Sequence, residues 1–260
     1  MNVSRKVLVE VCVDSVASAV AAQRGGAVRV ELCSNLVEGG VTPSAGLIEM
    51  TRAAVSLGIY VMIRPRAGDF CYDKDEFEIM KRDIELAKKM RADGVVLGIL
   101  DVNGNVDVTR TRQLVDLARP LKVTFHRAFD MTTDLLRALE DVCATEAERI
   151  LTSGGEQTAA EGSAMIAQLV QKSANRIVIM AGSGIKPENA RDLVENTGVR
   201  EIHVGLRNAI PSPMLHRNPK ITLGAIKDRE YQRFAVVEEN IAKLCRAVAE
   251  PRKSFPEKVL

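Results

Sequence analysis

The most constraining feature of this sequence is a repeated alternation between short apolar runs and longer charged stretches with helical periodicity. Near-continuous apolar character predicts strands buried on both faces, as in a parallel sheet covered by helices. The runs rich in Val, Ile and Leu lie at residues 7–13, 28–33, 59–65, 93–100, 121–129, 149–155, 176–185 and 201–207. Eight such units in 260 residues predict an α/β fold, a closed (β/α)8 barrel of the TIM-barrel class. An open, doubly wound sheet is the structural alternative, although the glycine fingerprint of dinucleotide-binding sheets is absent after the first run.

The stretches between the runs have the spacing of amphipathic helices. They are predicted at residues 15–24, 44–57, 74–90, 108–118, 134–143, 159–172, 187–196 and 228–249. Ser15 is a candidate N-cap of the first helix. The last helix is predicted from an apolar face made by Phe234, Val237, Ile241, Leu244 and Val248.

No linker or change of composition divides the chain, so we expect one domain over residues 1–260. Two irregular segments interrupt the alternation, at residues 65–76 and 208–227. In a barrel both would lie on the C-terminal face, where sites are built. Long loops of this kind serve either function or contacts between copies, and the proline-rich later segment leads us to expect a homo-oligomer.

Charge and composition exclude several classes of protein. The 36 basic and 34 acidic residues leave a net charge of +2, and aromatic residues make up 3% of the chain. A nucleic-acid binder would more often carry a basic face or stacking aromatics, so we expect no nucleic-acid partner. The 46% apolar content argues against disorder, and no apolar run is long enough to span a membrane. The five cysteines are dispersed and no apolar leader begins the sequence, so we expect reduced thiols in the cytoplasm.

The first two predicted strands repeat one motif, with the sequence VEVC at residues 9–12 and VELC at residues 30–33. Side chains two positions apart on a strand share a face, so Glu10 lies with Cys12 and Glu31 lies with Cys33. A carboxylate inside an apolar strand is costly unless its surroundings are polar. We therefore expect both glutamates in the mouth of the barrel, with the cysteines one layer nearer the rim.

Other strand ends offer partners for these carboxylates. Arg64 ends the third run and is the natural counter-ion of a buried glutamate. His126 ends the fifth run, and Glu10 or Glu31 with His126 would form an acid/base pair. Glu10, Glu31, Arg64 and His126 are thus candidate catalytic residues, with a purely structural salt bridge as the alternative.

The cysteine pair has its own chemistry. Neighbouring strands lie ~4.8 Å apart, so Cys12 and Cys33 could share one soft ion if their register allows it. Two thiolates satisfy Cu(I), whereas Zn(II) would need further ligands. The alternative is that both thiols pack as small apolar groups.

A third candidate site follows the last two runs. A glycine-rich loop, AGSGI, lies at residues 181–185, and a turn, VGLR, lies at residues 204–207. Both resemble the phosphate-binding loops that follow the seventh and eighth strands of many barrel enzymes. The candidate anion-binding residues are Gly182, Ser183, Gly184, Gly205 and Arg207. Tight turns with no ligand are the alternative.

Taken together, the motifs resemble the CutC copper-homeostasis family. The matching strings are EVCVDS, RVELCSNLVEGGVTPS, VMIRPRAGDFCY, DGVVLGIL, VTFHRAFDM and ERILTSGG. The resemblance implies a cytoplasmic, self-associating TIM barrel that handles copper, with Cys12 and Cys33 as proposed Cu(I) ligands. His203 matches a histidine of the family, but the loop at residues 181–184 lacks the three consecutive glycines common there.

Two function classes follow. The first is a cytoplasmic copper-homeostasis protein that binds Cu(I) through its cysteine pair. The second is a barrel enzyme that acts on a small phosphorylated or carboxylated substrate through the Glu/His/Arg residues. The sequence names neither a substrate nor an oligomer number.

Overall fold

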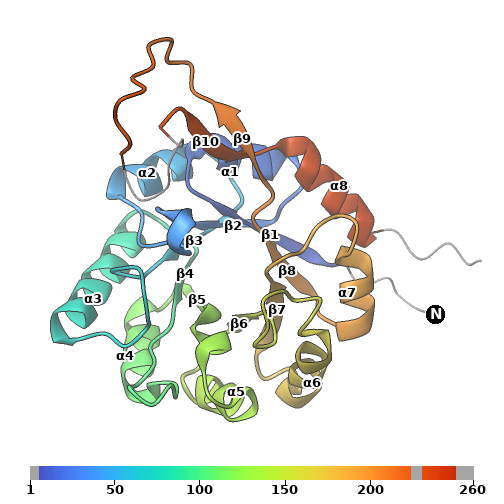
Figure 1. The fold of residues 1–260 in the computed structure, drawn as a ribbon. Coiled ribbons are helices and arrows are strands. Elements are labelled where there is room, and N and C mark those ends of the chain that lie inside the picture. Colours follow the sequence, from blue (N-terminus) through green and yellow to red (C-terminus); the bar gives the residue numbers. More distant parts are fainter. Residues whose placement is uncertain (1–5, 224–229, 250–260) are drawn as a thin grey trace, which may run out of the picture.

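Eight parallel strands close into a barrel in the order of the sequence (Figure 1). The computed structural model describes residues 6–223 and 230–249. The barrel strands are β1 Leu8–Val13, β2 Arg29–Leu32, β3 Gly58–Met62, β4 Gly94–Leu97, β5 Lys122–Phe125, β6 Arg149–Thr152, β7 Val178–Gly182 and β8 Glu201–Val204. Each overlaps a predicted run, and β1 pairs with both β2 and β8. The predicted (β/α)8 barrel is confirmed.

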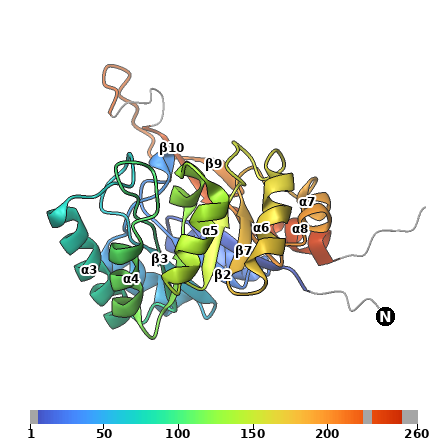
Figure 2. The same cartoon turned by 90° about the horizontal axis from the view of Figure 1, so that it is seen from below.

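Helices cover the outside of the barrel, and Figure 2 shows them packed around the strands. They are α1 Val16–Arg24, α2 Ala45–Ala54, α3 Lys74–Lys89, α4 Val108–Ala118, α5 Leu135–Ala144, α6 Ser163–Ser173, α7 Ala190–Thr197 and α8 Glu238–Ala249, with short 3-10 turns η1 Leu36–Glu38 and η2 Arg127–Met131. Ser15 caps α1, as predicted, because its hydroxyl accepts a hydrogen bond from the backbone N–H of Ser18. Within the described residues, no helix is long and apolar enough to cross a membrane.

The predicted final helix is wrong at its N-terminal end. Residues 228–229 lie outside the described part, and β10 Gln232–Val236 pairs antiparallel with β9 Arg207–Pro211. Phe234 therefore lies opposite Ala209 in a strand pair rather than on a helix. The reason is that the sequence YQRFAVV is rich in aromatic and β-branched residues, which suit a strand once a partner strand is present. Helix α8 begins only at Glu238.

A chain of buried ion pairs crosses the interior of the barrel. Arg29 bonds to Glu10, and its Nη2 lies 2.6 Å from Glu201 Oε2. Arg149 Nε lies 2.6 Å from the same Glu201 oxygen. The Arg29 guanidinium also stacks over the Tyr60 ring, with Cζ 4.8 Å from the centroid. Strands β1, β2, β6 and β8 are thus joined by charges as well as by their backbone ladders.

Replacing Arg29 by Met should lower the free energy of unfolding by about 3–5 kcal/mol, because Glu10 and Glu201 would keep buried charges with fewer partners. Urea denaturation monitored by circular dichroism measures this change. The matched control is Arg119→Met, which removes an arginine paired with Asp116 and Glu146 at the exposed surface and should change stability little. Equal stability of the Arg29→Met variant and the unmodified protein would contradict the structural role of the chain of ion pairs.

Candidate metal and ligand site at the barrel mouth

The C-terminal ends of the strands surround a cavity of about 980 Å³. Cys12, Glu31 and His203 line it from β1, β2 and β8. Arg64 and His126 line it from the segments that follow β3 and β5. The cavity therefore collects most of the chemistry-bearing residues that the sequence singled out.

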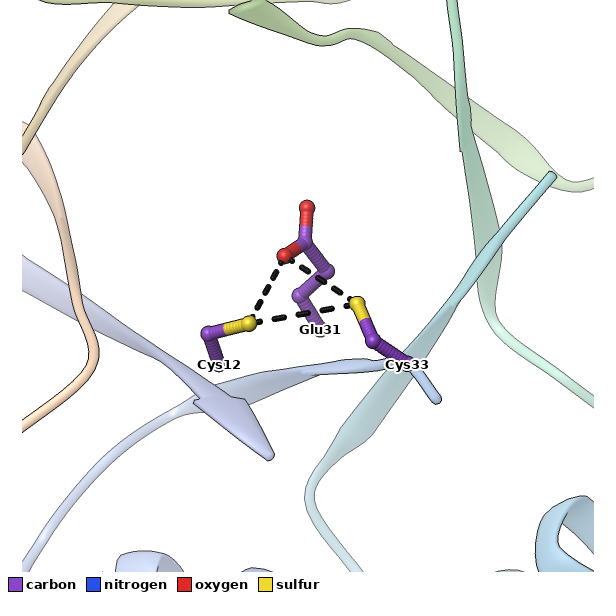
Figure 3. A group of neighbouring side chains, drawn as sticks. All are labelled: Cys12, Glu31 and Cys33. Carbon is purple, nitrogen blue, oxygen red and sulfur yellow. Dashed lines mark hydrogen bonds between the residues drawn. The ribbon is translucent and has the colours of Figure 1, made fainter. Parts of the chain in front are cut away.

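The sulfur atoms of Cys12 and Cys33 lie 3.9 Å apart (Figure 3). Glu31 Oε2 lies 3.1 Å from the Cys12 sulfur and 3.5 Å from the Cys33 sulfur. The strands are staggered, so Cys12 pairs with Glu31 in the β-ladder rather than with Cys33. This register leaves the two sulfur atoms near each other, which was the condition for a shared ion. We refer to Cys12, Glu31 and Cys33 as the sulfur cluster.

The members of the sulfur cluster differ in acidity. The hydrogen bond from Cys33, with help from His203 and against the effect of burial, lowers the pKa of the Cys12 thiol to about 5. Burial, together with neighbouring Cys12, raises the pKa of the Cys33 thiol well above its usual value. Burial and Cys12 also raise the pKa of the Glu31 carboxyl. Cys12 is therefore the thiol that loses its proton first.

His203 connects the sulfur cluster to the ion pairs below it. Its Nδ1 lies 2.7 Å from Glu10 Oε1, and its Nε2 lies 3.7 Å from Glu31 Oε2. Burial lowers the pKa of His203, but Glu31, Cys12 and Glu10 outweigh this and hold it well above the usual value. His203 is not among the predicted site residues, although it matches a histidine of the family. Only closure of the barrel, which pairs β8 with β1, brings it to Glu10.

Arg64 does not act as the counter-ion of Glu10 or Glu31, and that prediction is wrong. Its Nη1 donates to the carbonyl oxygens of Glu38 and Gly40, each at 2.9 Å, and its Nη2 donates to Gly68 O at 2.7 Å. Arg64 follows the end of β3, so it reaches the loops of the rim, while Arg29 on β2 meets the carboxylate of Glu10. Arg64 thus fixes two loops of the mouth.

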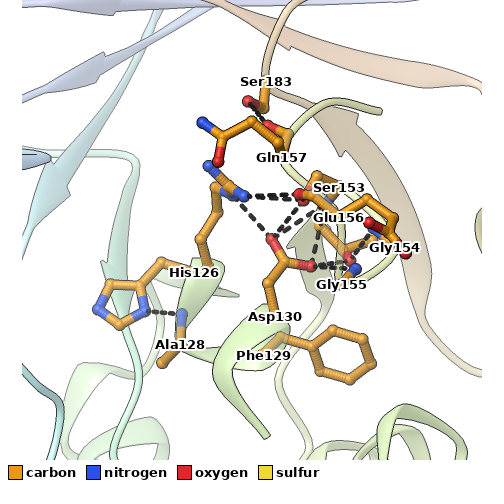
Figure 4. A network of polar contacts seen from close by, with 12 residues as sticks. His126, Ala128, Phe129, Asp130, Ser153, Gly154, Gly155, Glu156, Gln157 and Ser183 are labelled. Carbon is orange, nitrogen blue, oxygen red and sulfur yellow. Dashed lines mark hydrogen bonds and ion pairs between the residues drawn. The ribbon is translucent and has the colours of Figure 1, made fainter. Parts of the chain in front are cut away.

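His126 lies apart from the predicted glutamates. Its Nδ1 accepts a hydrogen bond from the backbone N–H of Ala128 at 3.2 Å (Figure 4). Its Nε2 is buried without a hydrogen-bond partner among the described residues. Burial, and then the charge of Arg64, lower the pKa of His126 to about 3. The imidazole is therefore neutral at neutral pH, and no hydrogen bond joins it to Glu10 or Glu31.

Asp130 ties the loop after β5 to the loop after β6 (Figure 4). Its carboxylate accepts hydrogen bonds from the backbone N–H groups of Ser153 and Gly155, at 3.0 and 3.1 Å, and from the Thr152 hydroxyl. Arg127 Nε lies 2.7 Å from the same carboxylate. Because its carboxylate accepts all of these hydrogen bonds, Asp130 holds together the two loops beside His126.

The candidate anion-binding residues are only partly assembled. Ser183, Gly184, Gly205 and Arg207 line the cavity, whereas Gly182 is buried within β7. The Ser183 hydroxyl donates to Gln157 O at 2.7 Å, and Arg207 Nη1 lies 3.5 Å from Asp14 Oδ2. The following helix begins at Ala190 rather than at residue 187. Anion binding by this loop pair stays a prediction.

Comparison with known proteins agrees with this arrangement. Residues 7–208 match the model of the CutC family. The chain is 46% identical to the mouse copper homeostasis protein cutC homolog over 93% of its own length and 89% of the relative's. It is 44% identical to a CutC family protein of Chromobacterium violaceum, over 94% and 97% of the two chains. The solved CutC structure from Streptococcus agalactiae superposes with a TM-score of 0.73 at 35% identity, covering 76% of this chain and 98% of that one.

The fold and the site define a (β/α)8 barrel with thiols, a carboxylate and an imidazole gathered at its C-terminal mouth. This chain belongs to the CutC family. Thiamine phosphate pyrophosphorylase from Pyrococcus furiosus, at 17% identity and a TM-score of 0.56 over 95% of this chain and 98% of that one, shares the barrel fold alone. The mouse relative and the Streptococcus agalactiae structure carry names that refer to copper homeostasis.

The acidities of His126 and His203 should differ widely in an NMR titration of the imidazole resonances. We expect His126 to stay neutral down to about pH 4, because its pKa is about 3. His203 should stay protonated above its usual pKa, and Glu10→Gln should lower that pKa because it removes an anionic partner. The His126 titration serves as the internal control and should not change in Glu10→Gln. A His203 titration near the ordinary pKa, unaffected by this substitution, would contradict the proposed electrostatics.

Proposed function

We propose that this protein handles copper by binding Cu(I) between Cys12 and Cys33. The observation that carries the proposal is the separation of 3.9 Å between their sulfur atoms. Half of that distance is about 2 Å, close to the ~2.3 Å of a zinc–thiolate bond. An ion between the sulfurs therefore needs only a small shift of the side chains.

The donor set favours a soft ion. Cu(I) prefers thiolates, and two of them suffice, whereas Zn(II) in structural sites takes four ligands. Glu31 also lies within the cluster, and donor atoms of Cys12, Glu31 and Cys33 lie within 4.8 Å of one another. His203 is engaged with Glu10 and is held in its protonated form, which cannot coordinate a metal. The two thiols thus remain the principal ligands.

The surroundings suit capture and release of an ion. Cys12 lines the cavity, whereas Cys33 is fully buried. The lowered pKa of the Cys12 thiol makes it the first to offer a thiolate. All five cysteines are unpaired, which fits the reducing conditions of the cytoplasm, where we place the protein.

The alternative of an enzyme has weaker support in the geometry. His126 was expected to act with Glu10 or Glu31, yet its ring bonds to the backbone of Ala128 instead. Glu10 is buried in the ion pairs beneath the cavity and does not line it. We therefore propose copper binding as the principal function of the sulfur cluster.

Competition with a chromophoric Cu(I) chelator under anaerobic conditions tests this function. We expect one Cu(I) per chain for the unmodified protein and none for the double variant Cys12→Ser, Cys33→Ser, because serine replaces both soft ligands. The double variant should keep the circular dichroism spectrum of the unmodified protein. Cys143→Ser, on helix α5 outside the barrel, is the matched control and should bind as the unmodified protein does.

Equal Cu(I) affinity of the double variant and the unmodified protein would refute the cysteine site. A parallel titration with Zn(II) separates the two metals. Binding of Zn(II) at the cysteines in preference to Cu(I) would also refute the proposal, because it would show that Glu31 and His203 complete a harder ligand set.

We also propose that the protein forms a homo-oligomer through the arm at residues 212–223, which follows β9. The arm projects from the barrel (Figure 1) and carries several exposed apolar side chains. These are Met214, Leu215, Ile221 and Leu223, with Leu215 97% exposed and Leu223 73% exposed. Such a group of apolar side chains on a projecting segment suits contact with another copy of the chain.

Analytical ultracentrifugation tests the arm. We expect a mass that is a multiple of 28.4 kDa for the unmodified protein. The double variant Leu215→Ser, Leu223→Ser should have a larger dissociation constant than the unmodified protein, because it removes apolar area from the contact. It should therefore be monomeric at concentrations at which the unmodified protein is still associated. Val102→Ser is the control, since Val102 is 87% exposed but lies in a different loop. A monomer at micromolar concentration in the unmodified protein would refute the proposal.

A further inference from the structure

Two buried donors at the barrel mouth have no hydrogen-bond partner among the residues that the structure describes. They are Nε of Arg64 and Nε2 of His126. The two residues are 5% and 4% exposed, and both line the cavity. A buried donor without a partner costs free energy. Two such donors beside one cavity therefore indicate that a bound ligand supplies the missing acceptors.

A single aromatic side chain lies against both residues. The Phe70 ring centroid is 4.9 Å from the centre of the His126 ring and 5.0 Å from Arg64 Cζ. Phe70 belongs to the irregular segment at residues 65–76, is only partly buried, and also lines the cavity. An aromatic face compensates an N–H group only weakly. A ligand that reaches both donors would therefore lie against this ring.

The two donors define the charge and shape of that acceptor. Both Nη atoms of Arg64 are bonded to backbone carbonyl oxygens, so the guanidinium is fixed, and its charge, its Nε–H and the second N–H of Nη2 remain available to a ligand. His126 accepts through Nδ1, so in the neutral imidazole the proton is on Nε2. One positive charge and these N–H groups suit the single charge and two oxygens of a carboxylate. A phosphate dianion would meet only one positive charge from these two residues.

The neighbouring surface suits an organic ligand. Leu36, Met62 and Leu151 line the same cavity and offer apolar contact to a carbon skeleton. A pocket with mostly apolar walls and a few convergent polar groups is typical of small-molecule sites.

We propose that the barrel mouth contains a second site, for a small organic carboxylate, in which Arg64 Nε and His126 Nε2 donate to the ligand's two oxygens. The Phe70 ring turns aside when the ligand enters. This site uses neither Cys12 nor Cys33, so it is separate from the proposed copper ligands.

Nitrogen-15 NMR of the imidazole groups tests the site directly, since the chain has only three histidines. Succinate and acetate are titrated against inorganic phosphate at matched ionic strength. We expect a saturable shift of the His126 Nε2 resonance with the carboxylates and none with phosphate. The double variant Cys12→Ser, Cys33→Ser should give the same result, so failure of copper binding and failure of this site are distinguishable.

Affinity for succinate is then compared across variants by ligand-detected NMR. His126→Asn keeps an oxygen that can accept from the Ala128 N–H but removes the Nε2 donor, and we expect binding weaker by roughly tenfold or more. Phe70→Leu removes the ring that covers the donors and should strengthen binding. Lys186→Gln, which removes a positive charge from another part of the cavity lining, is the control and should have a much smaller effect.

Three results would overturn the proposal. They are the absence of any saturable shift at His126, equal succinate affinity in His126→Asn and the unmodified protein, and phosphate binding as tight as succinate binding. If His126→Asn does not fold, Phe70→Leu decides alone, because a purely structural Phe70 would leave succinate affinity unchanged or lower it.

Discussion

The ion pairs that join Glu10, Arg29 and Glu201 are the interaction on which the site depends. They cross the centre of the barrel where strands β1, β2 and β8 meet, and Arg149 extends them to β6. Buried charges of this kind contribute little net stability compared with apolar packing, but removal of one partner is costly. The pairs therefore fix the inward-facing side chains inside the barrel. The thiols of Cys12 and Cys33 lie directly above them, nearer the C-terminal ends of the strands.

His203 shows how this order reaches the mouth. Glu10 is ionised beside Arg29, and its second oxygen lies against Nδ1 of His203. The imidazole is thereby oriented with Nε2 toward Glu31, which lies beside both sulfur atoms. Burial, hydrogen bonds and charge then give two chemically identical thiols opposite shifts in pKa. The ion pair thus reaches the proposed copper ligands through His203, which lowers the pKa of the Cys12 thiol alongside the larger effect of the hydrogen bond from Cys33.

A second, independent set of contacts organises the rim. Arg64 donates hydrogen bonds to three backbone carbonyl oxygens, and Asp130 accepts hydrogen bonds from the loop after β6. Arg64 uses both Nη atoms, and Asp130 uses its carboxylate, for contacts within the protein, which suits these residues to holding loops. Arg64 Nε and His126 Nε2 are left without a partner among the described residues. The mouth therefore combines a thiol site near its centre with two unsatisfied donors under Phe70.

Much of the fold could be predicted from the sequence because the strands of a parallel barrel are apolar on both faces and recur with a regular spacing. The run YQRFAVV was the exception. A short segment of this kind forms a strand when a partner strand is available, and β9 is that partner. In the site, the repeated V-E-x-C motif predicted that Cys12 and Cys33 lie on adjacent strands, but the register that brings their sulfur atoms to 3.9 Å came from the structure.

The partners of the charged residues could not be predicted in the same way. The sequence favours Arg64 because it ends a strand, but Arg29 meets Glu10 because the strand stagger pairs these two residues in the β-ladder. His203 meets Glu10 across 193 residues only because the eighth strand closes on the first. The sequence by itself determined the barrel and the adjacency of the two strands that carry the thiols, since both follow from local periodicity and chain order. Tertiary structure alone decided the ion partners and the acidities, since both depend on register around the closed barrel and on burial.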